Sequence, residues 1–146
     1  ETLVDIRSST INSKINLLKH TEDIHILGDE NKIAQVFDNL IQNAASFSKG
    51  NNFINIRIKK NLENVIITVE DNGPGFSKGS LKKVFDRFYT DRPKNEKFGN
   101  HSGLGLSISK QIVEAHSGSI EALNRLNQKN ECLGGSVKVI FPEVKN

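Results

Sequence analysis

The spacing of apolar residues along the chain predicts two long helices. Asp29 is a typical helix N-cap, and after it apolar residues recur at steps of three, four and seven, the period of one helical face. The residues of this face are Ile33, Val36, Phe37, Leu40, Ile41, Ala44 and Phe47. The stretch GLSISKQIVEAHSG (105–118) predicts a second helix that ends at Gly118. Its apolar side consists of Leu106, Ile108, Ile112, Val113 and Ala115.

Alternating apolar and polar residues predict strands between and after the helices. FINIRIKK (53–60) and NVIITVE (64–70) are separated by a short polar turn, so they predict a hairpin. Further strands are expected at SKINLLKH (13–20), DIHIL (23–27), SIEALN (119–124) and GSVKVIFP (135–142), and a short helix at 80–88. This order predicts an α/β fold, a two-layer sandwich in which helices cover one face of a mixed, mostly antiparallel sheet.

Chain length and composition fit a single domain. The 146 residues, 36% of them hydrophobic, suit one core over 1–146, and 1–12 is expected to be the end of a helix that begins upstream. The start at Glu1 and the absence of methionine suggest a segment of a longer protein. No apolar run approaches the length of a membrane span, so any membrane attachment is expected from upstream regions.

Charge and cysteine content narrow the function classes. The 20 Lys and Arg residues are interspersed with 17 Asp and Glu residues, so no nucleic-acid partner is expected. The net charge of +3 is only a weak indication of an anionic ligand. The single cysteine, Cys132, excludes an internal disulfide, and no Cys/His cluster has metal-ligand spacing, which together favour a reducing, cytoplasmic location.

Two asparagines on the first helix can form a metal site. Asn39 and Asn43 are four residues apart and therefore lie one above the other, at the margin of the apolar face. Amide oxygens in this arrangement can hold a hydrated Mg²⁺, which takes oxygen ligands and keeps several waters. The alternative is that both are ordinary solvated residues, as most exposed amides are.

A glycine-rich turn follows the second strand of the predicted hairpin. In DNGPGF (71–76), Gly73 and Gly75 permit a tight turn and Pro74 stiffens it, a pattern that by itself indicates only a turn. Asp71 adds a carboxylate at the mouth of the strand, where it can accept a hydrogen bond from an exocyclic amine such as that of adenine. A site built for that bond rejects a base that lacks the amine.

A long polar loop leads into the second helix. Residues 89–102 have no apolar face, which is typical of either a functional flap or a disordered segment. The loop carries Arg92, Lys94, Lys97 and His101. The helix then begins with GLGL (103–106), where backbone N–H groups without bulky side chains can bind phosphate. Glycine-rich helix starts also occur for packing reasons alone.

Four motifs in a fixed order resemble those of a known family. They are DNLIQNA (38–44), DNGPG (71–75), VFDRFY (84–89) and SGLGLSISKQIVEAHSG (102–118), followed by the closing strand GGSVKVIFP (134–142). From about Gly28 to Pro142 the sequence resembles the catalytic and ATP-binding domain of bacterial sensor histidine kinases, with its N, G1, F and G2 boxes. This domain has the Bergerat (GHKL) fold of the gyrase, Hsp90 and MutL superfamily. The stretches SFS and FYTDRP are similar to the ChvG/ExoS type of alphaproteobacterial envelope sensors.

The resemblance implies roles for individual residues. Asn43 would coordinate the Mg²⁺ that accompanies ATP, Asp71 would bond the adenine amine, and 90–102 would form the ATP lid. Asn39 occupies the position of the glutamate general base of gyrase-like ATPases. Because asparagine cannot act as a base, the resemblance favours a kinase over a self-contained ATPase. The implied catalytic residues are Asn39 and Arg92. The implied nucleotide-binding residues are Asn43, Ser46, Asp71, Gly73, Gly75, Phe76, Tyr89, Thr90, Arg92, Ser102, Gly103, Leu104, Gly105, Leu106 and Ser136.

Two positions depart from the commonest kinase pattern. Ser46 stands where a lysine is frequent and Thr90 where an arginine is frequent, and both usual residues would neutralise phosphate charge. Arg92 is expected to supply that charge instead. The alternatives are Arg87, Lys49 and Lys94.

The resemblance further implies that the chain is one half of an enzyme. None of the four histidines is followed by the acidic residue usual at a phosphoacceptor. The acceptor is therefore expected on a histidine-containing dimerisation domain of the same protein, with later transfer to a response regulator. The chain would be a cytoplasmic domain of an inner-membrane sensor. Three alternatives stay open: an anti-sigma-type serine kinase or protein-binding module, a degenerate domain that only regulates, and, least favoured because of Asn39, a gyrase-like ATPase.

Overall fold

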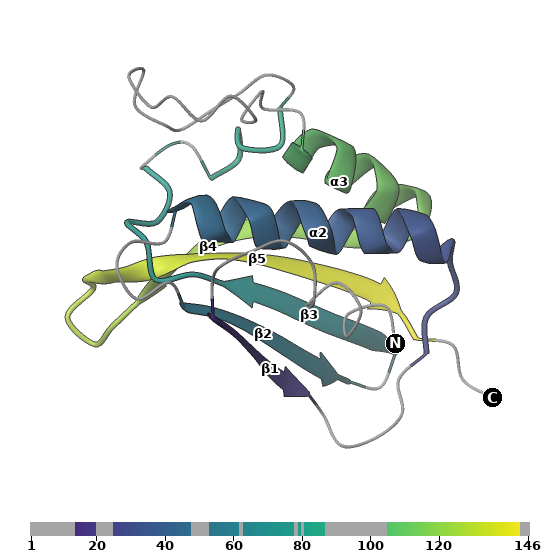
Figure 1. Ribbon diagram of the computed structural model, residues 1–146, viewed down its shortest axis with the longest axis horizontal. Coiled ribbons are helices and arrows are strands. Elements are labelled where there is room, and N and C mark those ends of the chain that lie inside the picture. Colours follow the sequence, from purple (N-terminus) through teal and green to yellow (C-terminus); the bar gives the residue numbers. More distant parts are fainter. Residues whose placement is uncertain are drawn as a thin grey trace.

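One five-stranded sheet and two helices make up the described part of the chain (Figure 1). The computed structural model describes residues 14–19, 25–47, 53–61, 63–77, 79, 81–86 and 105–143. The strands are β1 (Lys14–Lys19), β2 (Phe53–Lys60), β3 (Asn64–Glu70), β4 (Ser119–Leu126) and β5 (Cys132–Pro142). In the sheet order β1-β2-β3-β5-β4, only β1 and β2 pair in parallel, which confirms the predicted mixed, mostly antiparallel sheet.

Both described helices lie on the same face of the sheet, as predicted for a two-layer sandwich (Figure 1). They are α2 (Glu30–Phe47) and α3 (Gly105–Ala115). The core forms between α2 and the sheet, where the predicted apolar face of α2 meets the inward residues of the strands. Its fully buried members are Val36, Phe37, Leu40, Ile41, Ile54, Ile56, Val65, Val69, Val113, Val139 and Phe141. Neither helix is long and apolar enough to cross a bilayer.

The start of α2 is capped by the residue that the sequence predicts. Asp29 Oδ1 accepts hydrogen bonds from the backbone N–H groups of Asn31 (2.9 Å) and Lys32 (3.1 Å). The backbone N–H of Asp29 itself donates to Nε2 of His116 at 3.1 Å. Nδ1 of the same ring lies 2.7 Å from the carbonyl oxygen of Ile112 and donates to it, because the other nitrogen is an acceptor. His116 therefore joins the end of α3 to the start of α2.

The helix α3 ends just before Gly118, the residue predicted to mark its stop. The residue with left-handed backbone is Ser117, at φ 63°. Its N–H donates to the carbonyl of Glu114 (3.1 Å), and that of Gly118 to the carbonyl of Val113 (2.9 Å), the two bonds of a Schellman turn. Glycine is required at 118 for space, since a Cβ there would lie 2.4 Å from the carbonyl oxygen of Ile140.

Two predicted elements are wrong within the described residues. Residues 25–28 form no strand; Ile26 packs against the core without pairing to the sheet, and Leu27 is 83% exposed. Residues 81–86 form turns in place of the helix expected over 80–88. Val84 and Phe85 are nevertheless buried, because the turns alone bring them onto the core.

The buried side of α3 also differs from its predicted apolar stripe. Ala115 is exposed, whereas Ser107 and Ser109 are buried together with Ile112 and Val113. Small hydroxyl side chains let α3 approach α2 closely, so the buried face includes serines that a hydrophobic pattern does not count.

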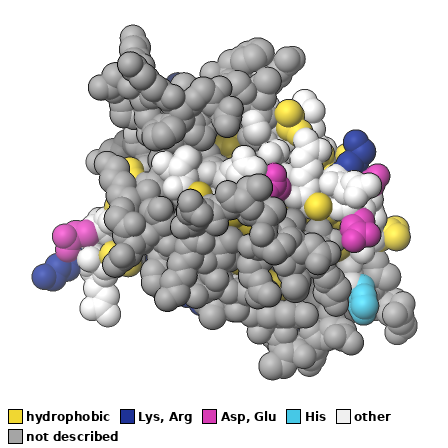
Figure 2. Space-filling model, viewed as in Figure 1, with side chains coloured by type: hydrophobic (Ala, Val, Ile, Leu, Met, Phe, Trp, Pro, Cys, Tyr) yellow, Lys and Arg dark blue, Asp and Glu magenta, His cyan; other side chains and the backbone are white. Residues whose placement is uncertain are grey.

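Charged side chains of both signs mix over the surface of the described residues. On the face drawn in Figure 2, Lys and Arg side chains lie next to Asp and Glu side chains. Ion pairs join Lys138 to Glu121 (3.1 Å) and Lys60 to Glu143 (3.6 Å).

Candidate functional site

The described parts of three predicted motifs lie on neighbouring elements of the fold. Figure 1 shows the C-terminal ends of α2 and β3 at the same end of the molecule, and α3 begins over the middle of α2, where Asn39 contacts Gly105. The turn 71–76 follows β3 directly, and α3 packs along α2. The fold thus brings the asparagines of α2, the acidic turn and the glycine-rich helix start toward one region.

Asp71 is a buried carboxylate at the end of β3. Its side chain is 5% exposed, and its Oδ1 accepts hydrogen bonds from the backbone N–H groups of Gly73 (2.9 Å) and Gly135 (3.0 Å). Its own N–H donates to the carbonyl oxygen of Gly135 at 3.0 Å. Within the described part of the chain, Oδ2 accepts no hydrogen bond. One oxygen is therefore held by the fold, and the other keeps its capacity to accept a bond.

Burial makes the charge of Asp71 costly. It raises the pKa of this carboxyl above its ordinary value, and the N–H groups of Gly135 and Gly73 and the positive charge of Arg125 partly oppose that rise. A buried, hydrogen-bonded carboxylate with a shifted pKa is characteristic of functional sites, although structural networks produce such shifts as well.

Asn39 connects α2 to the first turn of α3. Its Nδ2 donates to the carbonyl oxygen of Gly105 (3.3 Å) and to Oγ of Ser109 (3.4 Å). Ser109 Oγ also donates to the Gly105 carbonyl at 2.9 Å. The amide predicted to take part in catalysis is therefore engaged in holding the glycine-rich helix start against α2.

Asn43 lies one helical turn further along the same face of α2. Its side chain is half-buried, and its amide forms no hydrogen bond with the described part of the chain. Ser46 Oγ donates to the backbone carbonyl of Asn43 at 2.7 Å. Among the described residues, no three His, Cys, Asp or Glu side chains gather in a way that could hold a metal ion.

Of the remaining described candidates, Phe76 and Leu106 pack on the core, whereas Ser136 lies on the other face of the sheet. Phe76 is buried, and Leu106 packs at the edge of the core in the first turn of α3. Ser136 pairs with Glu70 across β3 and β5, so its side chain lies on the sheet face opposite to Asp71. The structure therefore does not bring Ser136 together with the other predicted residues.

Several predicted residues lie outside the described residues. They are Tyr89, Thr90, Arg92, Ser102, Gly103 and Leu104, the lid 90–102, and the alternative cations Arg87, Lys49 and Lys94.

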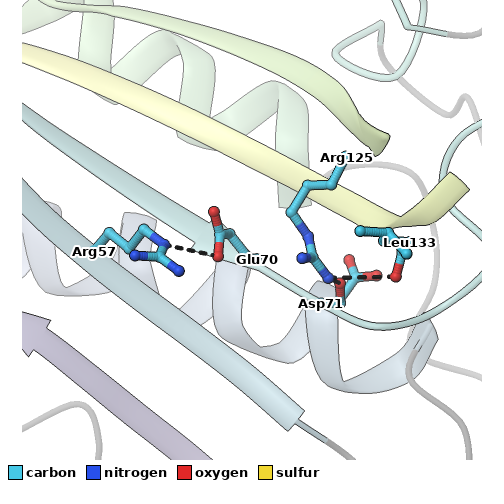
Figure 3. A network of polar contacts seen from close by, with 5 residues as sticks. All are labelled: Arg57, Glu70, Asp71, Arg125 and Leu133. Atoms are coloured by element: carbon cyan, nitrogen blue, oxygen red, sulfur yellow. Dashed lines mark hydrogen bonds and ion pairs between the residues drawn. The ribbon is translucent and has the colours of Figure 1, made fainter. Parts of the chain in front are cut away.

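Two residues that the sequence analysis missed contact the turn. Asn124 and Arg125 on β4 are hydrogen-bonded to the backbone of Phe76 and Asp71, and Figure 3 shows Arg125 reaching Asp71. These partners lie 48 and 54 residues away along the chain, and no local pattern around SIEALNRL marks the contacts. The neighbouring ion pair of Arg57 and Glu70 (3.0 Å) is partly exposed and contributes little to stability (Figure 3).

Comparison with known proteins identifies a family. Residues 28–145 match the family model of histidine kinase-, DNA gyrase B-, and HSP90-like ATPases. Over 116 residues the chain is 44% identical to the sensor protein ChvG of Agrobacterium fabrum, which confirms the predicted resemblance; the match covers 79% of this chain and 20% of that protein. The chain thus spans about a fifth of the length of this curated relative.

Solved structures show the same fold. The catalytic domain of histidine kinase ThkA, in a nucleotide-free form, superimposes with a TM-score of 0.74 at 28% identity, covering 98% of this chain and 87% of that one. A structure of ThkA in complex with the response regulator TrrA matches with a TM-score of 0.71 at 28% identity, covering 97% of this chain and 37% of that one.

Replacing Asp71 with asparagine is expected to change how stability depends on pH. Because the pKa of Asp71 is higher in the folded than in the unfolded chain, the folded state binds this proton more tightly. The resulting stabilisation is fully present at acid pH and is lost as the pH rises through the folded-state pKa. Asparagine does not ionise, so Asp71→Asn should gain stability relative to the unsubstituted chain as the pH rises.

Urea unfolding of both proteins at a series of pH values measures this difference. A difference in the free energy of unfolding that is constant from acid to neutral pH would contradict the shifted pKa.

Proposed function

The chain belongs to the family of histidine kinase-, DNA gyrase B-, and HSP90-like ATPases, and on this premise we propose that it is the ATP-binding catalytic domain of a sensor histidine kinase. It presents the γ-phosphate of ATP to a histidine on a dimerisation domain of the same full-length protein. A response regulator then takes the phosphoryl group. The sensor and histidine kinase relatives favour this proposal over a serine kinase of the anti-sigma type.

The geometry of Asp71 carries the proposal. Oδ1 of Asp71 is held by two backbone N–H groups, whereas Oδ2 accepts no hydrogen bond from the described residues. Oδ2 is therefore an acceptor suited to the exocyclic amine of adenine. Guanine carries a carbonyl at the corresponding position. Its oxygen and the carboxylate oxygen are both acceptors, so no hydrogen bond could form between them. Such an unpaired buried contact lowers affinity strongly, so Asp71 would select ATP over GTP.

Asn43 fits the metal that accompanies ATP. A half-exposed amide whose oxygen has no other partner in the described part of the chain is a ligand of the type that Mg²⁺ takes. One protein ligand suffices, because Mg²⁺ at nucleotide sites is held largely by phosphates and water. Bound Mg²⁺ supplies positive charge that neutralises the triphosphate.

Asn39 and the first turn of α3 would serve the phosphate end. By donating to the Gly105 carbonyl, Asn39 fixes the helix start whose free N–H groups suit a phosphate. Asparagine is not a base that could activate water, which favours transfer to a protein group over hydrolysis. Catalysis would then rest on positioning and charge neutralisation, with Arg92 as the expected cation.

The proposed partners follow from the same role. The ThkA complex with a response regulator supports a receiver domain as the partner of this chain too. We place the domain on the cytoplasmic side of an inner-membrane sensor, because that is where ATP is available to a sensor of external signals.

Asp71→Asn is expected to reverse the base preference. The asparagine Oδ1 would keep the bonds from Gly73 and Gly135, so its NH₂ group would take the place of the free oxygen. A donor there opposes the adenine amine and pairs with the guanine carbonyl, so the ATP affinity should fall by about tenfold or more while GTP gains relative to ATP.

Isothermal calorimetry with ATP and with GTP measures both affinities. Equal affinity of the unsubstituted chain for the two nucleotides would remove Asp71 from base recognition.

Asn43→Ala is expected to abolish most of the gain in ATP affinity that Mg²⁺ provides. The loss of one oxygen ligand should weaken Mg²⁺·ATP binding by about tenfold, and binding in EDTA should not change. Gln42→Ala is the matched control, because it removes an amide from the exposed neighbouring position of α2. Calorimetry with and without Mg²⁺ compares the three proteins, and an equal loss in EDTA would show that Asn43 is not a metal ligand.

The full-length protein is expected to autophosphorylate on a histidine. Phosphohistidine is labile in acid and stable in base, whereas phosphoserine is stable in acid, so the lability of radiolabel from γ-labelled ATP identifies the acceptor class. Acid-stable label would favour the serine kinase alternative.

A further inference from the structure

Both ends of the turn 71–76 are bonded to two consecutive residues of β4. At the far end, Asn124 Oδ1 accepts from the N–H of Phe76 at 2.7 Å, and Asn124 Nδ2 donates to the carbonyl of Phe76 at 2.9 Å. The amide thereby pairs with both backbone groups of Phe76, as a neighbouring strand would. At the near end, Arg125 Nη2 donates to the carbonyl oxygen of Asp71 and, at 3.3 Å, to that of Leu133 (Figure 3).

The two side chains reach the turn from opposite faces of the sheet. Asn124 is opposite Gly135 in the ladder and Arg125 is opposite Gly134, and successive residues of a strand point to opposite faces. Both partners on β5 are glycines, so neither of these two positions has a side chain that could lie between β4 and the turn. The ring of Phe76 fills the space beside Gly135, where a Cβ would lie 3.1 Å from Cε2.

The turn lies directly on the β4–β5 hairpin. A Cβ on Gly134, whose φ is +152°, would lie 2.0 Å from the carbonyl oxygen of Asp71. A Cβ on Gly75, whose φ is +80°, would lie 2.5 Å from Sγ of Cys132 and 2.7 Å from Oδ1 of Asn124. The shape of the turn therefore depends on its contacts with the hairpin.

We propose that Asn124 and Arg125 are positioning residues for base recognition, because they hold the turn 71–76 in the shape that presents Asp71 to the nucleotide. The inference rests on the proposed function, since it concerns the base that Asp71 would recognise. Neither residue is placed in contact with the base. Asn124 holds Phe76, the last residue of the turn, and so fixes the position of Gly73 within it. The N–H of Gly73 in turn orients the Asp71 carboxylate.

Arg125 has a second effect on the same carboxylate. Its positive charge lowers the pKa of Asp71 and so opposes the effect of burial. An ionised Asp71 is the better acceptor for an amine, so Arg125 supports both the place and the charge of the group that would read the base.

The ratio of ATP affinity to GTP affinity, measured by calorimetry, separates positioning from general stability. The two nucleotides share their phosphates, so a variant that only destabilises the fold leaves the ratio unchanged. Asn124→Ala and Arg125→Ala are each expected to lower the ratio by about tenfold, because a displaced Asp71 no longer discriminates between the bases. Asn124→Asp keeps an acceptor for the Phe76 N–H but lacks the donor for its carbonyl, so an intermediate ratio is expected.

Asn127→Ala is the matched control. Asn127 lies in the same hairpin, its Oδ1 accepts from the N–H groups of Lys129 (2.8 Å) and Glu131 (3.0 Å), and none of its hydrogen bonds joins it to the turn 71–76. This variant should lose stability and keep the ratio of the unsubstituted chain. A ratio that falls equally in Asn127→Ala and Asn124→Ala would overturn the inference.

The accessibility of Cys132 gives a readout that needs no nucleotide. Cys132 is the single cysteine of the chain, it is exposed, and its thiol donates to the carbonyl of Pro74 at 3.4 Å. If Asn124 holds the turn against the hairpin, Asn124→Ala should react faster with a thiol reagent than the unsubstituted chain does.

The outcomes distinguish the two proposals. An unsubstituted chain that binds neither nucleotide would overturn the proposed function and the inference with it. An unsubstituted chain that prefers ATP, with an unchanged ratio and an unchanged thiol reaction rate in Asn124→Ala, would overturn the inference and leave the proposed function standing.

Discussion

Two hydrogen bonds between Asp71 and Gly135 fix the point at which the turn 71–76 leaves the sheet. The first, from the Asp71 N–H to the Gly135 carbonyl, is an ordinary rung that continues the pairing of β3 and β5. In the second, the Gly135 N–H donates to the Asp71 side chain, where regular pairing would use a backbone carbonyl. The backbone carbonyl of Asp71 is thereby released to Arg125, and the carboxylate is locked in one orientation.

The burial that fixes Asp71 in place also makes its negative charge less favourable. Two backbone N–H groups and one guanidinium only partly offset that cost. Glycines at 75 and 134 permit the close packing of the turn on the hairpin, and no larger residue fits there. The site is thus held by backbone geometry and by contacts distant in sequence more than by the residues that would touch a nucleotide.

The sequence predicts well those features whose signal is local. The helical period of α2, its cap at Asp29 and the carboxylate at the end of β3 all follow from neighbouring residues. Short segments are less predictable, because apolar spacing alone does not separate a helix from turns that bury Val84 and Phe85. The roles of Asn124 and Arg125 could not be predicted at all, since they depend on a register that brings β4 beside a turn far away in the chain.

The attachment of α3 to α2 at both ends has a mechanical consequence. Asn39 bonds the first turn of α3, and His116 bonds its last turn to the N–H of Asp29. With two separated attachments, α3 is held against α2 at both of its ends, so its direction along α2 is fixed as well as its position. The segment that enters α2 at Asp29 and the last turn of α3 therefore share one imidazole, although 87 residues separate them along the chain.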